Sequence, residues 1–278
     1  MDWSKAKNIL IIAFIITNLF LIFSIEKGLY EDNSMVILKE KNIEDVISIL
    51  SEKGIRIETE IPRILLEMPV LDVEYETYNE DKVRMRFSHG RGISPKNKEK
   101  NIEVTKNKIF ISIENGNSPS IQGLSQHKAR EVAEKYIKDH EYMKSDVEYW
   151  KTFHRDGQYE VIFKQKYKGY FLEKSYMRLL IDVTGVIEFE RMWLTPVSTG
   201  TYKNEIMPAT KALLKAMQML EDRDKEVVIT DIHLGYLFDP SRISLTNWEN
   251  IKSGRALPAW RVTLKDGETL FIDAYEDY

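Results

Sequence analysis

The sequence predicts an α+β protein in which a single N-terminal transmembrane helix precedes a domain built from helix-plus-antiparallel-sheet units. Three observations support this prediction: an uncharged apolar run near the N-terminus, an amphipathic helix followed by alternating strands that occurs twice, and the absence of cysteine from all 278 residues. Without cysteine the chain has no disulfide and no thiol nucleophile. With 43% hydrophobic residues, 13 Gly and 8 Pro, the composition is typical of a globular protein stabilised by packing.

The apolar run covers residues 9–25, and its only polar members are Thr17, Asn18 and Ser24. As a helix it would be about 26 Å long, close to the ~30 Å hydrocarbon core of a bilayer. We therefore expect a transmembrane signal anchor over residues 9–27. A cleaved signal peptide and a buried core helix are the alternatives, but the flank after the run lacks the small-residue pair that signal peptidase requires.

The charges around the run predict its orientation. Lys5 and Lys7 precede it, whereas Glu26 and Lys27 cancel after it. By the positive-inside rule, residues 1–8 form a cytoplasmic N-terminus and the rest of the chain is extracytoplasmic. The expected location is the cell membrane, with a single pass through the lipid bilayer.

One face of the predicted anchor carries small residues. Ala13, Thr17 and Ser24 fall close together at 100° per residue, and Asn18 lies on a neighbouring face. Small residues permit close helix approach, and an amide in hydrocarbon needs a hydrogen-bond partner, so these four residues are a candidate helix-docking face. The alternative is that the small residues are merely tolerated and that Asn18 bonds back to its own turn.

Residues 30–120 are expected to form a first α+β lobe. An amphipathic pattern over 42–54 predicts a helix, and alternation over 70–77 and 82–87 predicts a hairpin. A further strand is expected over 108–114. The glycine- and proline-containing stretch 89–100 is interpreted as a solvated loop.

The rest of the chain is expected to form a second lobe from two similar units, residues 121–203 and residues 204–278. In the first unit, Ser125 caps a helix that precedes four strands, expected over 147–154, 159–167, 177–183 and 186–193. In the second, a helix begins at Pro208 and precedes three strands, expected over 227–238, 259–264 and 269–274.

The sequence predicts no catalytic residue, no metal site and no cofactor, and hence no enzymatic activity. None of the five histidines stands in a zinc-protease pattern. Ser125 and Lys128 match the Ser-x-x-Lys spacing of penicillin-recognising enzymes, but Ser125 is explained as the helix cap. Glu188 and Glu190 alternate with apolar residues, as expected for the wet face of a half-buried sheet. The net charge of -4 gives no support to nucleic-acid binding.

The opening Met1-Asp2-Trp3-Ser4-Lys5-Ala6-Lys7, which runs directly into the apolar stretch, resembles the start of the YycI family of membrane-anchored regulators from Gram-positive bacteria. The stretch from Gln165 to Tyr170 and the hairpin after Asp182 are similar to the extracytoplasmic domain of that family, which is YycH-like. Pro258-Ala259-Trp260-Arg261-Val262 also resembles PepSY modules, which are small helix-plus-sheet domains.

This resemblance implies a regulator without catalytic activity that works in signal transduction and cell-wall metabolism. Its implied partners are a YycH-like sister protein and the essential sensor histidine kinase YycG, also called WalK, of a two-component system. The alternative is an exported, cell-wall-associated ligand-binding or hydrolytic protein. A flat sheet face with exposed aromatic residues would favour protein-protein interaction, whereas a cluster of ionisable groups buried in a concave pocket would favour the alternative.

Overall fold

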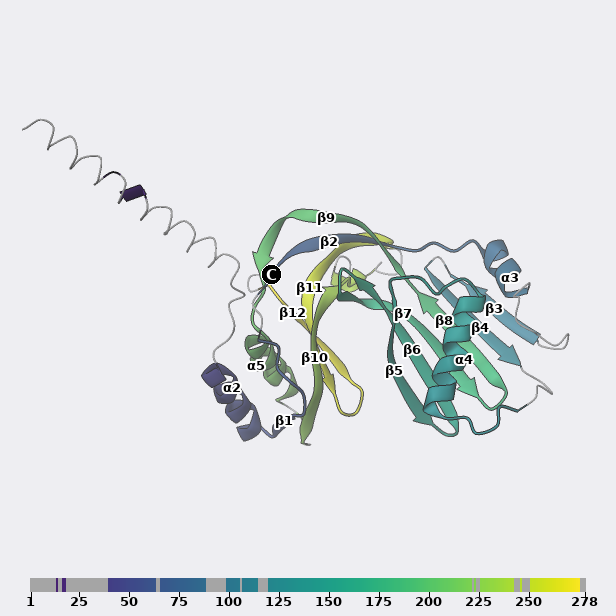
Figure 1. Cartoon of the computed structure of the whole chain (residues 1–278), viewed down its shortest axis with the longest axis horizontal. Coiled ribbons are helices and arrows are strands. Elements are labelled where there is room, and N and C mark those ends of the chain that lie inside the picture. The colour runs from purple at the N-terminus through teal and green to yellow at the C-terminus, as the bar shows by residue number, and fades with distance from the viewer. Residues whose placement is uncertain are drawn as a thin grey trace, which may run out of the picture.

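The computed structural model describes residues 14, 17, 18, 40–63, 66–88, 99–105, 107–114, 120–221, 223, 226–242, 246 and 251–275. Within them, four α-helices accompany one twelve-stranded sheet (Figure 1), which confirms the predicted α+β class. The helices are α2 (Glu40–Glu52), α3 (Glu80–Ser88), α4 (Gln126–Asp139) and α5 (Ala209–Leu220). The strands are β1 (Ile55–Ile57), β2 (Glu67–Tyr75), β3 (Glu99–Val104), β4 (Lys108–Glu114), β5 (Val147–Arg155), β6 (Gln158–Tyr167), β7 (Tyr170–Asp182), β8 (Gly185–Met192), β9 (Leu194–Glu205), β10 (Val227–Leu237), β11 (Ser253–Leu264) and β12 (Thr269–Asp273).

No helix among the described residues has both the length and the apolar character needed to cross a membrane. The predicted cytoplasmic segment 1–8 and the predicted anchor 9–27 lie outside the described residues, except for Phe14, Thr17 and Asn18. The anchor therefore stays a prediction.

The sheet runs in the order β3-β4-β8-β7-β10-β11-β2-β9, with β6 and β5 continuing from β7, β1 beside β10 and β12 beside β11. Two halves meet where the start of β7 pairs in parallel with β10, through Phe171 with Gly235 and Leu172 with Tyr236. The later residues of β7 pair with β8 instead. In Figure 1, β2 and β9 run side by side along the top of the molecule and connect the two halves.

The first half has its own hydrophobic core, which we call the α4 core. Helix α4 packs on one face of β5, β6, β7 and β8 (Figure 1), and α3 and β4 complete the cluster. Ala129, Ala133 and Ile137 lie on the buried side of α4 at the i, i+4, i+8 spacing of one helical face. The cap predicted from the sequence is confirmed, since Ser125 Oγ accepts a hydrogen bond from the Lys128 amide at 3.3 Å.

The second half is organised around α5 and is called the α5 core. Helix α5 packs with α2 and against β11 and β12, and its residues Ala212, Leu213 and Ala216 are buried. Pro208 is the N-cap residue of this helix. Ile43, Val46 and Leu50 of α2 are buried in the same cluster, whereas Ile47 is 43% exposed. The α4 core takes α3, β3 and β4 from the segment before residue 120, and the α5 core takes α2, β1 and β2.

The hairpin expected from residues 70–77 and 82–87 is wrong, because residues 80–88 form helix α3. Asn79 begins the helix: its side-chain oxygen accepts the Lys82 amide and its carbonyl accepts the Val83 amide, both at 3.0 Å. Val83 and Phe87 are buried four residues apart on one helical face, while Met85 between them is 57% exposed. An apolar residue at every second position fits a strand in this segment, but its first and last members also fit a helix.

Several strands were missed or shortened by the sequence-based prediction. Strand β3 begins within the stretch interpreted as a loop, and β1 and β9 were not expected. Strand β11 begins at Ser253, six residues before the expected start, because its first part pairs with β2 and only its second part pairs with β12. These strands lack a clear alternation of apolar and polar residues, so their existence and their ends are determined by the strands with which they pair.

Candidate functional site

The face of the α4 half that points away from α4 carries a network of charged side chains. Alternation along the strands sends Met177, Leu179 and Phe189 into the α4 core and places their sequence neighbours on the opposite face. The neighbours that form the network are Glu160 on β6, Tyr176 and Arg178 on β7, Glu188 and Glu190 on β8, and Lys108 on β4. We call this set the sheet-face network.

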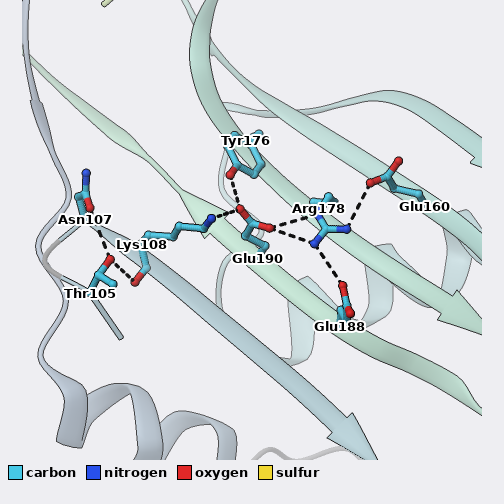
Figure 2. A network of polar contacts seen from close by, with 8 residues as sticks. All are labelled: Thr105, Asn107, Lys108, Glu160, Tyr176, Arg178, Glu188 and Glu190. Atoms are coloured by element: carbon cyan, nitrogen blue, oxygen red, sulfur yellow. Dashed lines mark hydrogen bonds and ion pairs between the residues drawn. The ribbon is translucent and has the colours of Figure 1, made fainter. Parts of the chain in front are cut away.

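Arg178 is the centre of the sheet-face network (Figure 2). Its Nε and Nη2 donate to Glu190 Oε2 at 3.2 and 3.0 Å, Nη2 also donates to Glu188 Oε2 at 3.2 Å, and Nη1 donates to Glu160 Oε1 at 3.3 Å. The other oxygen of Glu190 accepts from Lys108 Nζ and from the Tyr176 hydroxyl. Strand register explains the geometry, since Arg178 lies directly opposite Glu190.

The network favours the charged forms of Glu190 and Arg178 and the neutral form of Tyr176. Burial favours the neutral acid at Glu190, but the hydrogen bonds from Lys108 and Tyr176 and the nearby cations outweigh it, so the pKa of Glu190 is lowered. Burial also opposes the charge on Arg178, yet the three carboxylates raise the pKa of its guanidinium. Burial, followed by the hydrogen bond to Glu190, raises the pKa of the Tyr176 hydroxyl. The face is therefore a fixed array of two cations and three carboxylates.

A second charged cluster lies where the two halves meet. Arg261 on β11 is 1% exposed, and its Nη1 donates to both oxygens of Glu173 on β7 at 2.9 Å. Lys164 Nζ lies 2.7 Å from Glu173 Oε2, and Arg261 Nη2 lies 3.1 Å from Asp231 Oδ2. Burial lowers the pKa of Lys164, and the charge of Glu173 opposes this effect. We call Lys164, Glu173, Asp231 and Arg261 the junction cluster.

A shallow pocket of about 350 Å³ opens beside the junction cluster. Trp150 and Phe171 line it, and the Arg261 guanidinium carbon lies 5.5 and 5.2 Å from their ring centroids. His233 Nδ1 lies 2.8 Å from Asp231 Oδ1 at its rim. Of the two features that would discriminate the functional alternatives, ionisable groups buried beside a pocket are present, whereas the sheet face is lined by charged side chains and not by the expected exposed aromatics.

Of the four residues of the predicted helix-docking face, the structure describes two, Thr17 and Asn18. Asn18 Nδ2 donates to the carbonyl of Phe14 at 2.8 Å, which is the bond within its own turn that the sequence left as an alternative. Thr17 is exposed. Ala13 and Ser24 lie outside the described residues, so the docking face as a whole stays a prediction.

The structure accounts for the other residues considered from the sequence. Lys128 Nζ donates to the Gln122 carbonyl at 2.8 Å, so it bonds the backbone before α4 while Ser125 caps the helix. Trp193 and Trp260 are 1% and 2% exposed and belong to the two cores. Among the described residues, no group of three or more His, Asp or Glu side chains could hold a metal ion.

The two charged clusters were missed by the sequence analysis. Glu188 and Glu190 lie on the expected face of the sheet, away from the core, but only Glu188 is partly exposed there, whereas Glu190 is buried. Glu173 pairs with Arg261, which is 88 positions away, so no local pattern indicates their contact. One signal was available at Arg261, which interrupts a run that otherwise fits a buried strand, and a charge at such a position requires a partner.

The fold and these clusters define an α+β domain whose charged groups are paired with one another across a single large sheet. Two crystal structures share this fold. An uncharacterized protein from Eubacterium rectale ATCC 33656 is 12% identical, with 85% of this chain and 97% of that chain covered and a TM-score of 0.52. YycH from Bacillus subtilis is 11% identical, with a TM-score of 0.53; 78% of this chain is covered, but only 54% of the YycH chain.

The sequence assigns the family more narrowly. The model of the family described as YycI protein matches residues 33–275. The chain therefore belongs to the YycI family, as its resemblance to that family indicated. No curated protein matches it in sequence.

Proposed function

We propose that this protein is a membrane-anchored, extracytoplasmic regulator that modulates the essential sensor histidine kinase YycG in the two-component system controlling cell-wall metabolism. The observation that carries the proposal is the family match over residues 33–275, which covers both cores. The likeness to the YycH fold fits the same system. In this proposal the protein has no catalytic activity and acts through contacts with a YycH-like sister protein and with the kinase.

The sheet-face network is the proposed surface for the sister protein. Its members come from β4, β6, β7 and β8, and their cross-strand hydrogen bonds hold long side chains in place before a partner binds. A partner therefore orders fewer side chains on binding, which lowers the entropic cost of association. With three carboxylates and two cations, the network fits a partner surface with a small excess of positive charge.

The anchor is the proposed contact with the kinase. We propose that residues 9–27 cross the cell membrane once, with residues 1–8 in the cytoplasm, and that Ala13, Thr17, Asn18 and Ser24 face other membrane helices. To change kinase output, the anchor must bind the active and inactive states of the kinase with different free energies, because equal affinity for both states leaves the equilibrium between them unchanged.

Two pairs of substitutions in the full-length chain test these contacts separately. Glu160→Lys with Glu188→Lys reverses two network charges that are about one-third exposed, and it is expected to reduce recovery of the sister protein from solubilised membranes. Thr17→Leu with Asn18→Leu is expected to reduce recovery of the kinase. Glu134→Lys on α4, where Glu134 is 39% exposed and paired with Arg130, is the matched charge reversal and should change neither.

The proposal predicts that kinase autophosphorylation in membranes changes with either pair. Wild-type recovery of both partners together with unchanged autophosphorylation would contradict it. Wild-type recovery of the sister protein from the Glu160/Glu188 variant, together with reduced recovery of the kinase from the Thr17/Asn18 variant, would retain the anchor contact and remove the role of the sheet face.

A second candidate function, an exported cell-wall-associated ligand-binding or hydrolytic protein, is favoured by the pocket beside the junction cluster. Arg261 and Asp231 are fixed there, next to the half-buried Trp150. Binding of purified cell-wall fragments by the full-length protein, lost on Trp150→Ala and retained by the Glu160→Lys variant, would support this candidate over the regulator.

A further inference from the structure

A separate pocket of about 280 Å³ lies where β2 ends, α3 begins and the chain leaves α4. Four cationic side chains line it, and only two carboxylates do. The cations are Lys82, Arg86, Lys144 and Arg191, and the carboxylates are Glu76 and Glu141. We propose that this pocket binds a small oxyanion, a carboxylate or a phosphate group, between Arg191 and the lysines at its rim.

Arg191 is the buried floor of the pocket. Its side chain is 1% exposed, and Nη1 donates to Glu76 Oε2 and to the Tyr78 hydroxyl. Its Nε is buried and has no hydrogen-bond partner among the residues that the structure describes. A buried donor without a partner costs free energy, and a small rotation of the guanidinium toward an oxyanion in the pocket would satisfy it.

Two guanidinium groups share one aromatic ring at this site. The guanidinium carbons of Arg86 and Arg191 lie 4.8 and 4.7 Å from the ring centroid of Tyr142. Both guanidinium groups therefore bring positive charge to the same ring at the wall of the pocket. Burial raises the pKa of the Tyr78 and Tyr142 hydroxyls, so both remain neutral and supply hydrogen-bond donors instead of negative charge.

At the rim of the pocket, the cationic side chains outnumber the carboxylates that pair with them. Glu76 is shared between Arg191 and Lys144, whose Nζ lies 3.5 Å away, and Glu141 lies 3.6 Å from Arg86. Lys82 makes no ion pair with any described residue. The pocket therefore retains an excess positive charge at its opening, which attracts anions and holds them at low ionic strength.

The site is independent of the proposed regulatory function. Arg191 follows Glu190 on β8, so its side chain points to the opposite face of the sheet from the sheet-face network. Binding of an oxyanion here requires neither the anchor nor a partner protein.

Calorimetric titration of the full-length protein in detergent tests the proposal. The probes are inorganic phosphate and succinate, each at constant ionic strength with chloride as the reference anion. We expect at least one probe to bind more tightly than chloride. Lys82→Gln and Lys144→Gln should each weaken its binding about threefold to fivefold, the range expected for one partly exposed ion pair, and the double variant by on the order of tenfold.

Lys265→Gln is the matched control, because Lys265 is 64% exposed and lies in the α5 half. It should bind the probe as the wild type does. If neither probe exceeds chloride, or if the Lys82 and Lys144 variants bind like the control, the assignment is overturned. A response to phosphate alone or to succinate alone identifies which oxyanion the site takes.

Discussion

At the junction of the two halves, the side chain of Glu173 fills the space that a side chain on residue 235 would need, and residue 235 is glycine. A Cβ on Gly235 would lie 2.8 Å from Glu173 Oε1 and 2.7 Å from the carbonyl oxygen of Phe171. Real Cβ atoms do not approach backbone so closely, so only glycine allows the Glu173 carboxylate to reach Arg261 while β7 and β10 remain paired. The short parallel contact between β7 and β10 therefore depends on a residue without a side chain.

Gly235→Ala is expected to destabilise the protein by about 1–3 kcal/mol, because the added methyl group either pushes the backbones of β7 and β10 apart or displaces the buried carboxylate of Glu173. Urea unfolding measures the change. Gly200→Ala on β9 is the control, since its Cβ would lie 3.3 Å from the nearest atom, a contact that a small shift relieves; we expect a loss of about 0.5 kcal/mol. Equal losses for the two variants would contradict the close-approach argument.

The junction cluster should respond non-additively to substitution. Glu173→Gln leaves Arg261 and Lys164 buried with less compensation, and a loss of about 3–5 kcal/mol is expected. Replacing all three by apolar residues, as Lys164→Met, Glu173→Leu and Arg261→Met, removes the charges together and should cost less than the single change. A triple variant whose loss equals the sum of its single variants would show that the three residues do not act as a unit.

His140 makes stability depend on pH near neutrality. It is 7% exposed, stacks on Phe87 with ring centroids 4.4 Å apart, and has Nδ1 2.7 Å from the Tyr136 carbonyl. Burial lowers its pKa below the usual 6.5, and the hydrogen bond to Tyr136 opposes this only in part. The folded protein thus binds the proton more weakly than the unfolded chain, so stability is lost as pH falls from 6.5 toward the folded pKa.

Urea unfolding at several pH values between 8 and 5 checks this expectation. His140→Gln should reduce the loss of stability over this range, whereas His127→Gln, at an 82% exposed side chain, should not. The same pH dependence in the wild type and in His140→Gln would rule out His140 as its source.

Helix α3 should depend on Asn79, the residue that immediately precedes it and accepts its first free amides. Asn79→Ala removes the side-chain acceptor of the Lys82 amide and is expected to cost about 1 kcal/mol, while Asn79→Asp keeps an acceptor and should cost little. Thermal unfolding followed by circular dichroism compares the two. A strand in this position would make both substitutions equally tolerated.

Local periodicity in the sequence predicted much of this fold. Helices α4 and α5 and most of the strands after each of them were predicted because their side chains repeat every 3.6 or every two residues, and a cap or proline marks where each helix begins. Periodicity failed at Val83 and Phe87, whose spacing fits both helix and strand, and only packing against the α4 core decides between them.

The sequence by itself determined the α+β class, the family and the alternation that separates core from surface. Tertiary structure alone decided which charges meet. Arg178 is satisfied by carboxylates on two other strands, and Arg261 by Glu173 on β7 and Asp231 on β10. Such pairs form because strand register brings together residues far apart in the chain, and a buried charge has a large free-energy cost until that register exists.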